Sequence, residues 1–269
     1  MFYFSHLLCD EEMKEVIQET GMGVESIEFS IAENLDNLSK TLLSYEKRLE
    51  KMECEKLLLH GPFLDLNPVS YDLSIRKVTM ERYEEAYQAA KVLGAKKIVY
   101  HTCYVPDFYL LIGWAERMAE FYREFLYEKD DSIEIVMENV LDRIPQPMAE
   151  VAEKIEHPAF GLCLHGGHAN CYSKVSCEEW FQTEKKYLKH LHLHDNKGDR
   201  DSHLPLGTGT ISGNVVRGIL QEEQVKTCTI ECSTQEAVLA SFYGAKKLFE
   251  NKRTDNSCLL YTSDAADDG

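Results

Sequence analysis

The sequence predicts a closed (β/α)8 barrel in one domain, and three observations lead to that prediction. Short apolar runs alternate with longer stretches of helical period eight times before residue 250, and strands that alternate with helices form parallel βαβ units. The 269-residue chain shows no composition break that would mark a linker, and α/β barrels commonly use about 250 residues as one unit. No Gly-rich phosphate-binding motif follows any strand, which weakens the alternative of a doubly wound open sheet.

The eight predicted strands are short apolar runs that end in polar or glycine-containing segments. They cover residues 2–9, 23–30, 56–63, 96–103, 133–140, 159–168, 188–196 and 228–233. The helices between them have apolar residues three and four positions apart. Gly94 lies where a helix C-cap belongs, and Pro145 and Pro147 suit the first turn of the helix after the fifth strand. One helical stripe is interpreted as core packing; it consists of Trp114, Met118, Phe121 and Phe125.

Composition narrows the partners and the compartment. Lys and Arg number 29 against 46 Asp and Glu, a formal charge of −17 that repels nucleic acid and anionic membranes. Nine cysteines, an odd number without a C-x-x-C pair, favour reduced thiols over a disulfide framework. The first residues do not resemble a signal peptide, and no apolar run is long enough to span a membrane. We therefore expect a cytoplasmic protein without a membrane partner, and the charge counts against nucleic-acid binding without excluding it. A homo-oligomer is also possible.

The last residues do not fit a ninth strand–helix unit. Residues 254–269 are acidic and lack helical period, so we expect a disordered tail after a single domain of residues 1–253. The tail resembles a translated cloning or sequencing adaptor, which suggests that it is not native.

A stretch rich in potential metal ligands runs from residue 190 to 209, HLHLHDNKGDRDSHLPLGTG. Alternate positions in a strand share one face, so His190, His192 and His194 would point the same way. Imidazole and carboxylate suit zinc, manganese or iron, although His-rich loops that bind nothing are also common. We expect His194, at the strand end, to be a ligand, and His190 and His192 to be core residues with hydrogen-bond partners.

The loop after this strand supplies further candidates. Asp201 and His203 are two residues apart and could hold another ion or orient a hydroxyl group. Lys197 and Arg200 could contact a phosphate or sugar oxygens, and solvated loop charges are the alternative.

A histidine or glutamate occurs near the carboxyl end of every predicted strand, where barrel enzymes place their active sites. These residues are His6, Glu28, His60, His101, Glu138, His165, His194 and Glu231. Their convergence on one mouth indicates a metal centre. Glu138 and Glu231, on strands five and eight, could bracket an ion and a small substrate and exchange protons at a carbon next to a carbonyl. His165 and His168, separated by two glycines, could both turn inward.

In combination, seven motifs identify a resemblance over residues 1 to about 248. They are HGPFLDLNP (60–68), LGAKKIVYH (93–101), MEN (137–139), LCLHGGHAN (162–170), HLHDN (192–196), DSHLPLGTGTI (201–211) and TIEC (229–232). The chain resembles the sugar isomerase/epimerase-like members of the xylose isomerase-like barrel superfamily. That superfamily also contains the apurinic/apyrimidinic endonucleases related to endonuclease IV.

The resemblance implies a divalent metal, zinc or manganese being favoured, with one to three ions. In the isomerases and epimerases the ion would be held by Glu138, His165, His194 and Glu231, the two glutamates would form the acid/base pair, and His168 would contact substrate. The endonuclease branch implies nine zinc ligands: His60, His101, Glu138, His165, His168, His194, Asp201, His203 and Glu231. One position departs from the family, which usually has Asp where this chain has His165. Imidazole there weakens the case for magnesium, and lost activity is a further interpretation.

Three functions follow as hypotheses. The first is a metal-dependent isomerase or epimerase of a small sugar or sugar phosphate. The second is a zinc-cluster phosphodiesterase that acts on abasic DNA, which the charge of −17 disfavours. The third is a non-catalytic barrel that binds a metal or a sugar.

Overall fold

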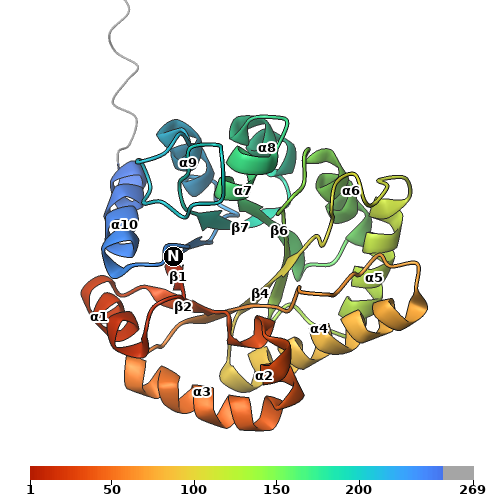
Figure 1. The fold of residues 1–269 in the computed structure, drawn as a ribbon, viewed down its shortest axis with the longest axis horizontal. Helices are drawn as coiled ribbons and strands as arrows, with labels where there is room; N and C mark the ends of the chain where they lie inside the picture. Colours follow the sequence, from red (N-terminus) through yellow and green to blue (C-terminus); the bar gives the residue numbers. More distant parts are fainter. Residues whose placement is uncertain (251–269) are drawn as a thin grey trace, which may run out of the picture.

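The computed structural model describes residues 1–250, which form a closed barrel of eight parallel strands surrounded by helices (Figure 1). The strands pair in sequence order, and β8 closes the ring against β1. They are β1 (Phe2–Ser5), β2 (Gly23–Ser26), β3 (Leu57–His60), β4 (Lys97–His101), β5 (Glu134–Glu138), β6 (Phe160–His165), β7 (Leu188–Leu193) and β8 (Thr227–Ile230). The prediction of a (β/α)8 barrel is confirmed, and the alternative prediction of a doubly wound open sheet is wrong.

A helix follows each strand, and α4 and α6 carry the end residues that the sequence predicts. The helices are α1 (Asp10–Thr20), η1 (Glu28–Ser30), α2 (Ala32–Asp36), α3 (Leu38–Met52), α4 (Leu73–Leu93), α5 (Trp114–Leu126), α6 (Gln146–Ile155), α7 (Gly166–Tyr172), α8 (Cys177–Glu184), α9 (Gly213–Leu220) and α10 (Gln235–Glu250). Gly94 ends α4 with a left-handed φ of 72°, a conformation that costs glycine little. Pro145 precedes α6 and Pro147 lies in its first turn, as predicted.

The hydrophobic core lies between the outward faces of the strands and the helices around them. Tyr83 of α4 stacks on Tyr100 of β4 with ring centroids 3.8 Å apart, and Phe125 of α5 meets both rings edge-on. The predicted α5 stripe is buried in this core, including Trp114 at 1% exposure. Its interpretation as packing is therefore confirmed.

All eight strands end earlier than predicted, and in two cases the early end places a candidate residue on a helix. β6 stops at His165 because Gly166 begins α7, whose first turn is capped by the His165 imidazole accepting a hydrogen bond from His168 N–H. Gly167 is required there, since a Cβ atom would lie 2.1 Å from the His194 ring. His168 thus lies on a helix. β2 stops at Ser26, which places Glu28 in η1.

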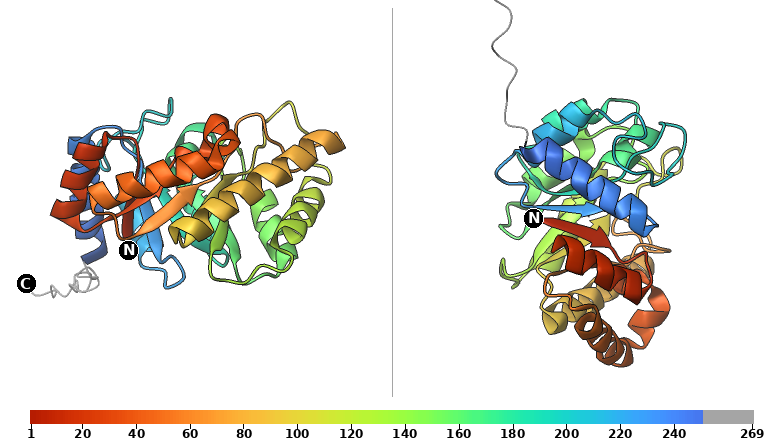
Figure 2. Two further views of the ribbon diagram at one scale, coloured as in Figure 1. Left: turned by 90° about the horizontal axis from the view of Figure 1, so that it is seen from below. Right: turned by 90° about the vertical axis from the view of Figure 1, so that its left-hand side faces the viewer.

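The loops that follow the strands lie at one end of the barrel and face the reader in Figure 1. The side views of Figure 2 place the N-terminus at the other end. No helix among residues 1–250 is long and apolar enough to cross a membrane. The predicted tail of residues 254–269 lies outside the described residues.

Candidate metal centre

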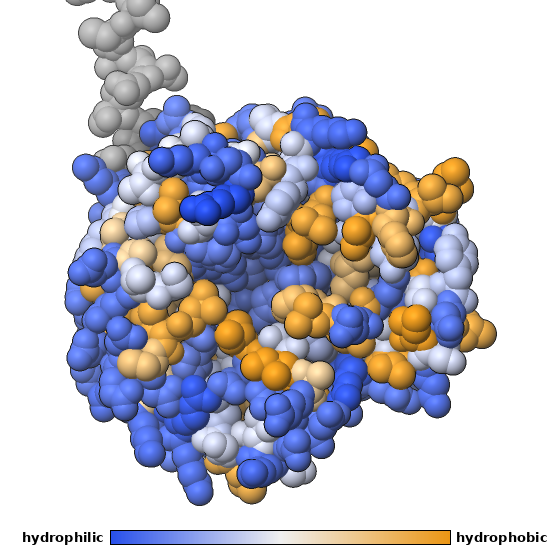
Figure 3. Space-filling model, viewed as in Figure 1, coloured by the Kyte–Doolittle hydropathy of each residue, from blue (hydrophilic) through white to orange (hydrophobic). Residues whose placement is uncertain are grey.

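All nine candidate ligands gather at the carboxyl ends of the strands, in the hollow that Figure 3 shows at the middle of this face. Side chains alternate along a strand, so residues two apart, such as Val136 and Glu138, both face the barrel interior. The ligand-type atoms form close groups with all members within 4.8 Å of one another. These groups are His60–His101–Glu138, Glu138–His165–His168, His165–His192–Glu231 and His194–Asp201–His203. We call the nine residues together with His192 the metal centre.

The first group surrounds Glu138 at the end of β5. Its Oε2 atom lies 3.4 Å from His60 Nε2 and 3.5 Å from His101 Nε2, and these two nitrogens are 3.1 Å apart. His60 Nδ1 lies 3.0 Å from the Gly61 carbonyl oxygen, so it donates there and leaves Nε2 as the free lone pair. Two imidazole nitrogens and one carboxylate therefore face a common point.

The His165–His192–Glu231 group surrounds Glu231, which directly follows β8. Its Oε2 lies 2.8 Å from His165 Nε2, and its Oε1 accepts a hydrogen bond from Ser5 Oγ at 3.2 Å. Glu138 Oε1 lies 3.9 Å from the same His165 nitrogen. The residue that departs from the family pattern thus stands between the two glutamates.

The His194–Asp201–His203 group centres on Asp201 in the loop after β7. Asp201 Oδ1 is 2.9 Å from His194 Nε2, and Oδ2 is 3.3 Å from His203 Nε2. The same Oδ2 is 3.4 Å from His168 Nε2, and His168 Nδ1 lies 3.5 Å from Glu138 Oε1. His168 connects this group with the first.

His192 has a role that the sequence analysis missed. It is fully buried, as expected for a core residue, but its Nδ1 lies 3.4 Å from Glu138 Oε2 and 3.3 Å from Glu231 Oε1. On its other side, Nε2 is 3.0 Å from Glu25 Oε1. His192 therefore contacts both glutamates instead of packing only in the core.

Glu25 was also missed, because the predicted second strand was too long and directed attention to Glu28. Glu25 is fully buried below His192, and its Oε2 lies 3.1 Å from His190 Nε2. His190 Nδ1 is 2.7 Å from Thr227 Oγ1, so the prediction of His190 as a hydrogen-bonded core residue is confirmed. Period-two alternation from Gly23 was the signal that could have placed Glu25 inside the barrel.

Four predicted residues do not join the metal centre. His6 and Glu28 belong to a separate cluster: His6 Nδ1 lies 2.9 Å from Tyr45 Oη, and Glu28 pairs with Arg48. The expectation that all eight strand ends converge is therefore wrong for strands one and two. Lys197 and Arg200 are exposed, and their side chains form no ion pair within residues 1–250.

Burial and neighbouring imidazoles set the charges of the metal centre. Burial favours the neutral acids, but nearby imidazoles, His192 first, hold the pKa of Glu138 and Glu231 well below the usual range. Burial lowers the pKa of His101 and His165 to about 3, so both imidazoles are neutral near pH 7. Burial also disfavours a charged His168, yet contacts with Asp201 and Glu138 raise its pKa to about 10.

Several buried atoms of the centre have no hydrogen-bond partner among the described residues. They are Glu138 Oε2, His192 Nδ1, His194 Nε2 and Asp201 Oδ1, although each has another ligand-type atom within about 3.5 Å. Buried polar atoms are normally paired, and an absent ion is one physical reason for such a group. Crowded imidazole and carboxylate atoms that point at common centres therefore fit a zinc- or manganese-type ion.

Comparisons with known proteins agree with the fold. Uncharacterized protein MJ1311 of Methanocaldococcus jannaschii is 29% identical over 194 residues, which is 68% of this chain and 66%, just under two thirds, of that protein. The crystal structure of a D-tagatose 3-epimerase-like protein has a TM-score of 0.74 at 23% identity, covering 93% of this chain and 97% of that chain. The IOLI protein, solved with a bound zinc atom, has a TM-score of 0.73 at 15% identity, covering 92% and 97%.

At these identities the structural likeness shows a shared fold. The family described as the xylose isomerase-like TIM barrel matches residues 17–249. This chain therefore belongs to the xylose isomerase-like TIM barrel family.

Proposed function

We propose that the protein is a metal-dependent isomerase or epimerase of a small sugar or a sugar derivative. The observation that carries this proposal is the pair of buried carboxylates, Glu138 and Glu231, which flank His165 and His192 in one polar hollow. The protein's structural likeness to a D-tagatose 3-epimerase-like protein and to a D-psicose 3-epimerase supports the substrate class.

Glu138, His165, His194 and Glu231 would hold the ion. When bound, a divalent ion polarises a carbonyl oxygen and stabilises the negative charge that develops on an enediolate. Both glutamates are ionised near neutral pH because their pKa values are depressed, so either can accept a proton from a carbon next to a carbonyl. In an isomerisation, the glutamate that accepted the proton can return it to the neighbouring carbon. In an epimerisation, the other glutamate would take up a proton from water and donate it to the opposite face of the substrate, and the first glutamate would release its proton to water.

His168 is placed to orient the substrate. Its raised pKa of about 10 keeps it protonated, so it can donate to a hydroxyl or carbonyl oxygen. Lys197 and Arg200, exposed on the loop after β7, would contact a phosphate only if the substrate carries one.

Proton exchange in deuterated water tests the proposal. Purified, zinc- or manganese-loaded protein is incubated with a panel of ketoses, aldoses and their phosphates, and deuterium uptake next to the carbonyl is followed by NMR. We expect uptake with at least one sugar, and its loss after chelation. A metal-loaded protein that exchanges no sugar proton and epimerises none would contradict the proposal and favour a non-catalytic barrel.

A second candidate is a phosphodiesterase that cleaves abasic DNA. The observation that favours it is the completeness of the nine-residue ligand set, in which His60–His101–Glu138 and His194–Asp201–His203 are separate groups suited to further ions. The net charge of −17 opposes binding to a duplex. Cleavage of an abasic-site oligonucleotide at physiological salt by the zinc-loaded protein would promote this candidate over the first.

A further inference from the structure

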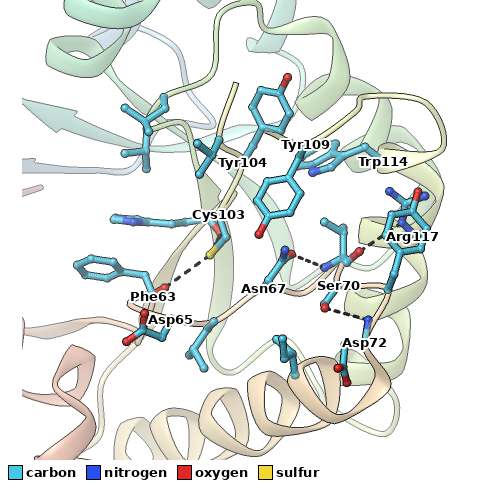
Figure 4. Close-up of a pocket in the computed structure, with 18 of the residues that line it drawn as sticks. Phe63, Asp65, Asn67, Ser70, Asp72, Cys103, Tyr104, Tyr109, Trp114 and Arg117 are labelled. Carbon is cyan, nitrogen blue, oxygen red and sulfur yellow. Dashed lines mark hydrogen bonds between the residues drawn. The ribbon is translucent and has the colours of Figure 1, made fainter. Parts of the chain in front are cut away.

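A large pocket opens directly beside the metal centre. It has a volume of about 700 Å³ and lies between the loops after β3, β4 and β5 (Figure 4). His101 belongs to both the metal centre and the pocket wall, and Phe63 stacks on His101 with ring centroids 4.2 Å apart. A ligand held at the metal centre can therefore extend past these two rings into the pocket, which we call the side pocket.

Apolar and aromatic groups form most of the side pocket. Its walls include Leu66, Val69, Ile75, Val105, Leu110 and Trp114. Figure 4 shows Tyr104, Tyr109 and Trp114 along one side, with Phe63 and Cys103 at one end and Arg117 at the other. Flat aromatic walls suit an aryl group, because aromatic rings pair edge-to-face or in offset stacks.

Two polar side chains of the side pocket accept hydrogen bonds from the protein itself. Asn67 Oδ1 accepts a hydrogen bond from Val69 N–H, and Ser70 Oγ accepts one from Asp72 N–H. A sugar ring needs a hydrogen-bond partner for nearly every hydroxyl group when it leaves water. Apolar atoms form the larger part of the side-pocket surface, so an apolar group fits it better than a second sugar ring does.

Arg117 provides a positively charged donor at one end of the side pocket (Figure 4). Arg117 is the single Lys or Arg among the residues lining the pocket; its Nε–H donates to Val69 O, and its guanidinium lies 4.4 Å from the Tyr71 ring centre. No carboxylate within residues 1–250 forms an ion pair with Arg117.

We propose that the substrate is a sugar or polyol that carries an aryl or similarly sized apolar substituent. The polyol occupies the metal centre and the substituent occupies the side pocket. This rests on the proposed function, since the metal centre must hold the polyol. The volume of about 700 Å³ falls within the range of pockets that enclose drug-sized ligands.

The exposed apolar rim beside the pocket provides a matched control. Phe108, Leu110 and Ile112 are 77%, 72% and 83% exposed on the loop before α5, and Figure 3 shows hydrophobic residues gathered along this side of the mouth. Val105 and Leu110 line the pocket, whereas Phe108, on the same loop, does not. Val105→Asp or Leu110→Asp therefore introduces a negative charge into the pocket, whereas Phe108→Asp introduces the same charge outside it.

Hydroxamates of two sizes test the proposal on the zinc-loaded protein. A hydroxamate presents two adjacent oxygen atoms, as an enediolate does, so acetohydroxamate probes the metal centre alone and 3-phenylpropanohydroxamate adds an aryl tail. By isothermal titration calorimetry we expect the aryl compound to bind roughly thirtyfold more tightly, from burial of its ring. We expect Val105→Asp and Leu110→Asp to reduce this ratio below about threefold, and Phe108→Asp to preserve it.

The outcomes separate this inference from the proposed function. Equal binding of the two hydroxamates overturns the side-pocket inference and leaves the metal centre intact. A second copy of the chain covering the rim is another outcome. It is shown if the two hydroxamates bind equally and the wild-type protein is a dimer that dissociates in Phe108→Asp by analytical ultracentrifugation, and it also overturns the side-pocket inference. Failure of both hydroxamates to bind counts against the metal centre. In that case ligand-observed NMR with benzyl alcohol tests the side pocket alone. Saturation transfer from the protein to benzyl alcohol that is lost in Val105→Asp and kept in Phe108→Asp supports the side-pocket inference. Absence of transfer from the wild-type protein overturns it.

Discussion

The metal centre and the side pocket share the mouth of the barrel but are built in opposite ways. The metal centre is polar and lies largely on strand ends, and seven of its ten residues are less than 10% exposed: His60, Glu138, His165, His168, His192, His194 and Glu231. The side pocket is apolar and lies on loops, with Leu64 and Leu110 each 72% exposed. Strands fix atoms more precisely than loops do, and loops change more freely. We infer that the strands fix the chemistry and the loops select the substrate.

The largest effect is expected at the two glutamates of the metal centre. Glu138→Gln and Glu231→Gln each remove a carboxylate that can accept a proton, so we expect proton exchange in deuterated water to fall about a thousandfold. Circular dichroism should show an unchanged fold. Exchange within tenfold of the wild-type rate in either variant would contradict the assignment of that glutamate.

Glu184 provides the matched control for these two variants. It is fully buried on α8, and its carboxylate oxygens have no hydrogen-bond partner among the described residues. Burial, reinforced by Asp142, raises its pKa well above the usual range, so the neutral acid is favoured. Glu184→Gln therefore replaces one neutral side chain with another of similar shape, and we expect proton exchange to stay within twofold of wild type.

The next effect concerns His165, where the resemblance implies that most relatives carry Asp. His165→Asp puts a carboxylate beside Glu231, whose Oε2 lies 2.8 Å from the present imidazole, and removes the stacking on His168 at 3.5 Å. Without metal, we expect about 3 kcal/mol lower free energy of unfolding. Added manganese or magnesium should restore more stability to the variant than to the wild type. Thermal unfolding with and without each ion measures this, and an equal metal response of both proteins would contradict it.

A smaller effect is expected behind the side-pocket wall, at Asp142. Burial raises the pKa of Asp142 from 3.8 to about 6, against hydrogen bonds donated by Thr102 Oγ1 and Val140 N–H. Because the folded pKa lies above the unfolded one, ionisation destabilises the fold, and stability is lost as pH rises from about 4 to about 6.

Asp142→Asn tests this pH dependence. An amide oxygen can accept the same two hydrogen bonds without ionising. We expect the variant to gain up to about 3 kcal/mol over wild type at pH 7 and little at pH 4. Urea unfolding at the two pH values measures the difference; an equal gain at both would show that the carboxyl group does not titrate as described.

The contrast between strand ends and loops also explains how much could be predicted from the sequence. Apolar runs and the two-residue alternation of side chains located all eight strands, so the residues at their ends, such as Glu138 and His194, were placed correctly. The period does not say where a strand stops, and for that reason Glu28 was chosen instead of Glu25. The contact of His192 with both glutamates depends on packing across the barrel interior, which a linear pattern does not encode. The side pocket was not predicted, because loop residues such as Val105 and Tyr109 have no period at all.

Metal content tests the central claim most directly. Protein purified without chelator or added metal is analysed by inductively coupled plasma mass spectrometry and then titrated with zinc and manganese. We predict one to three divalent ions per chain, reduced in Glu231→Gln and unchanged in Glu184→Gln. A metal-free wild-type protein that also fails to bind added zinc or manganese would contradict the account.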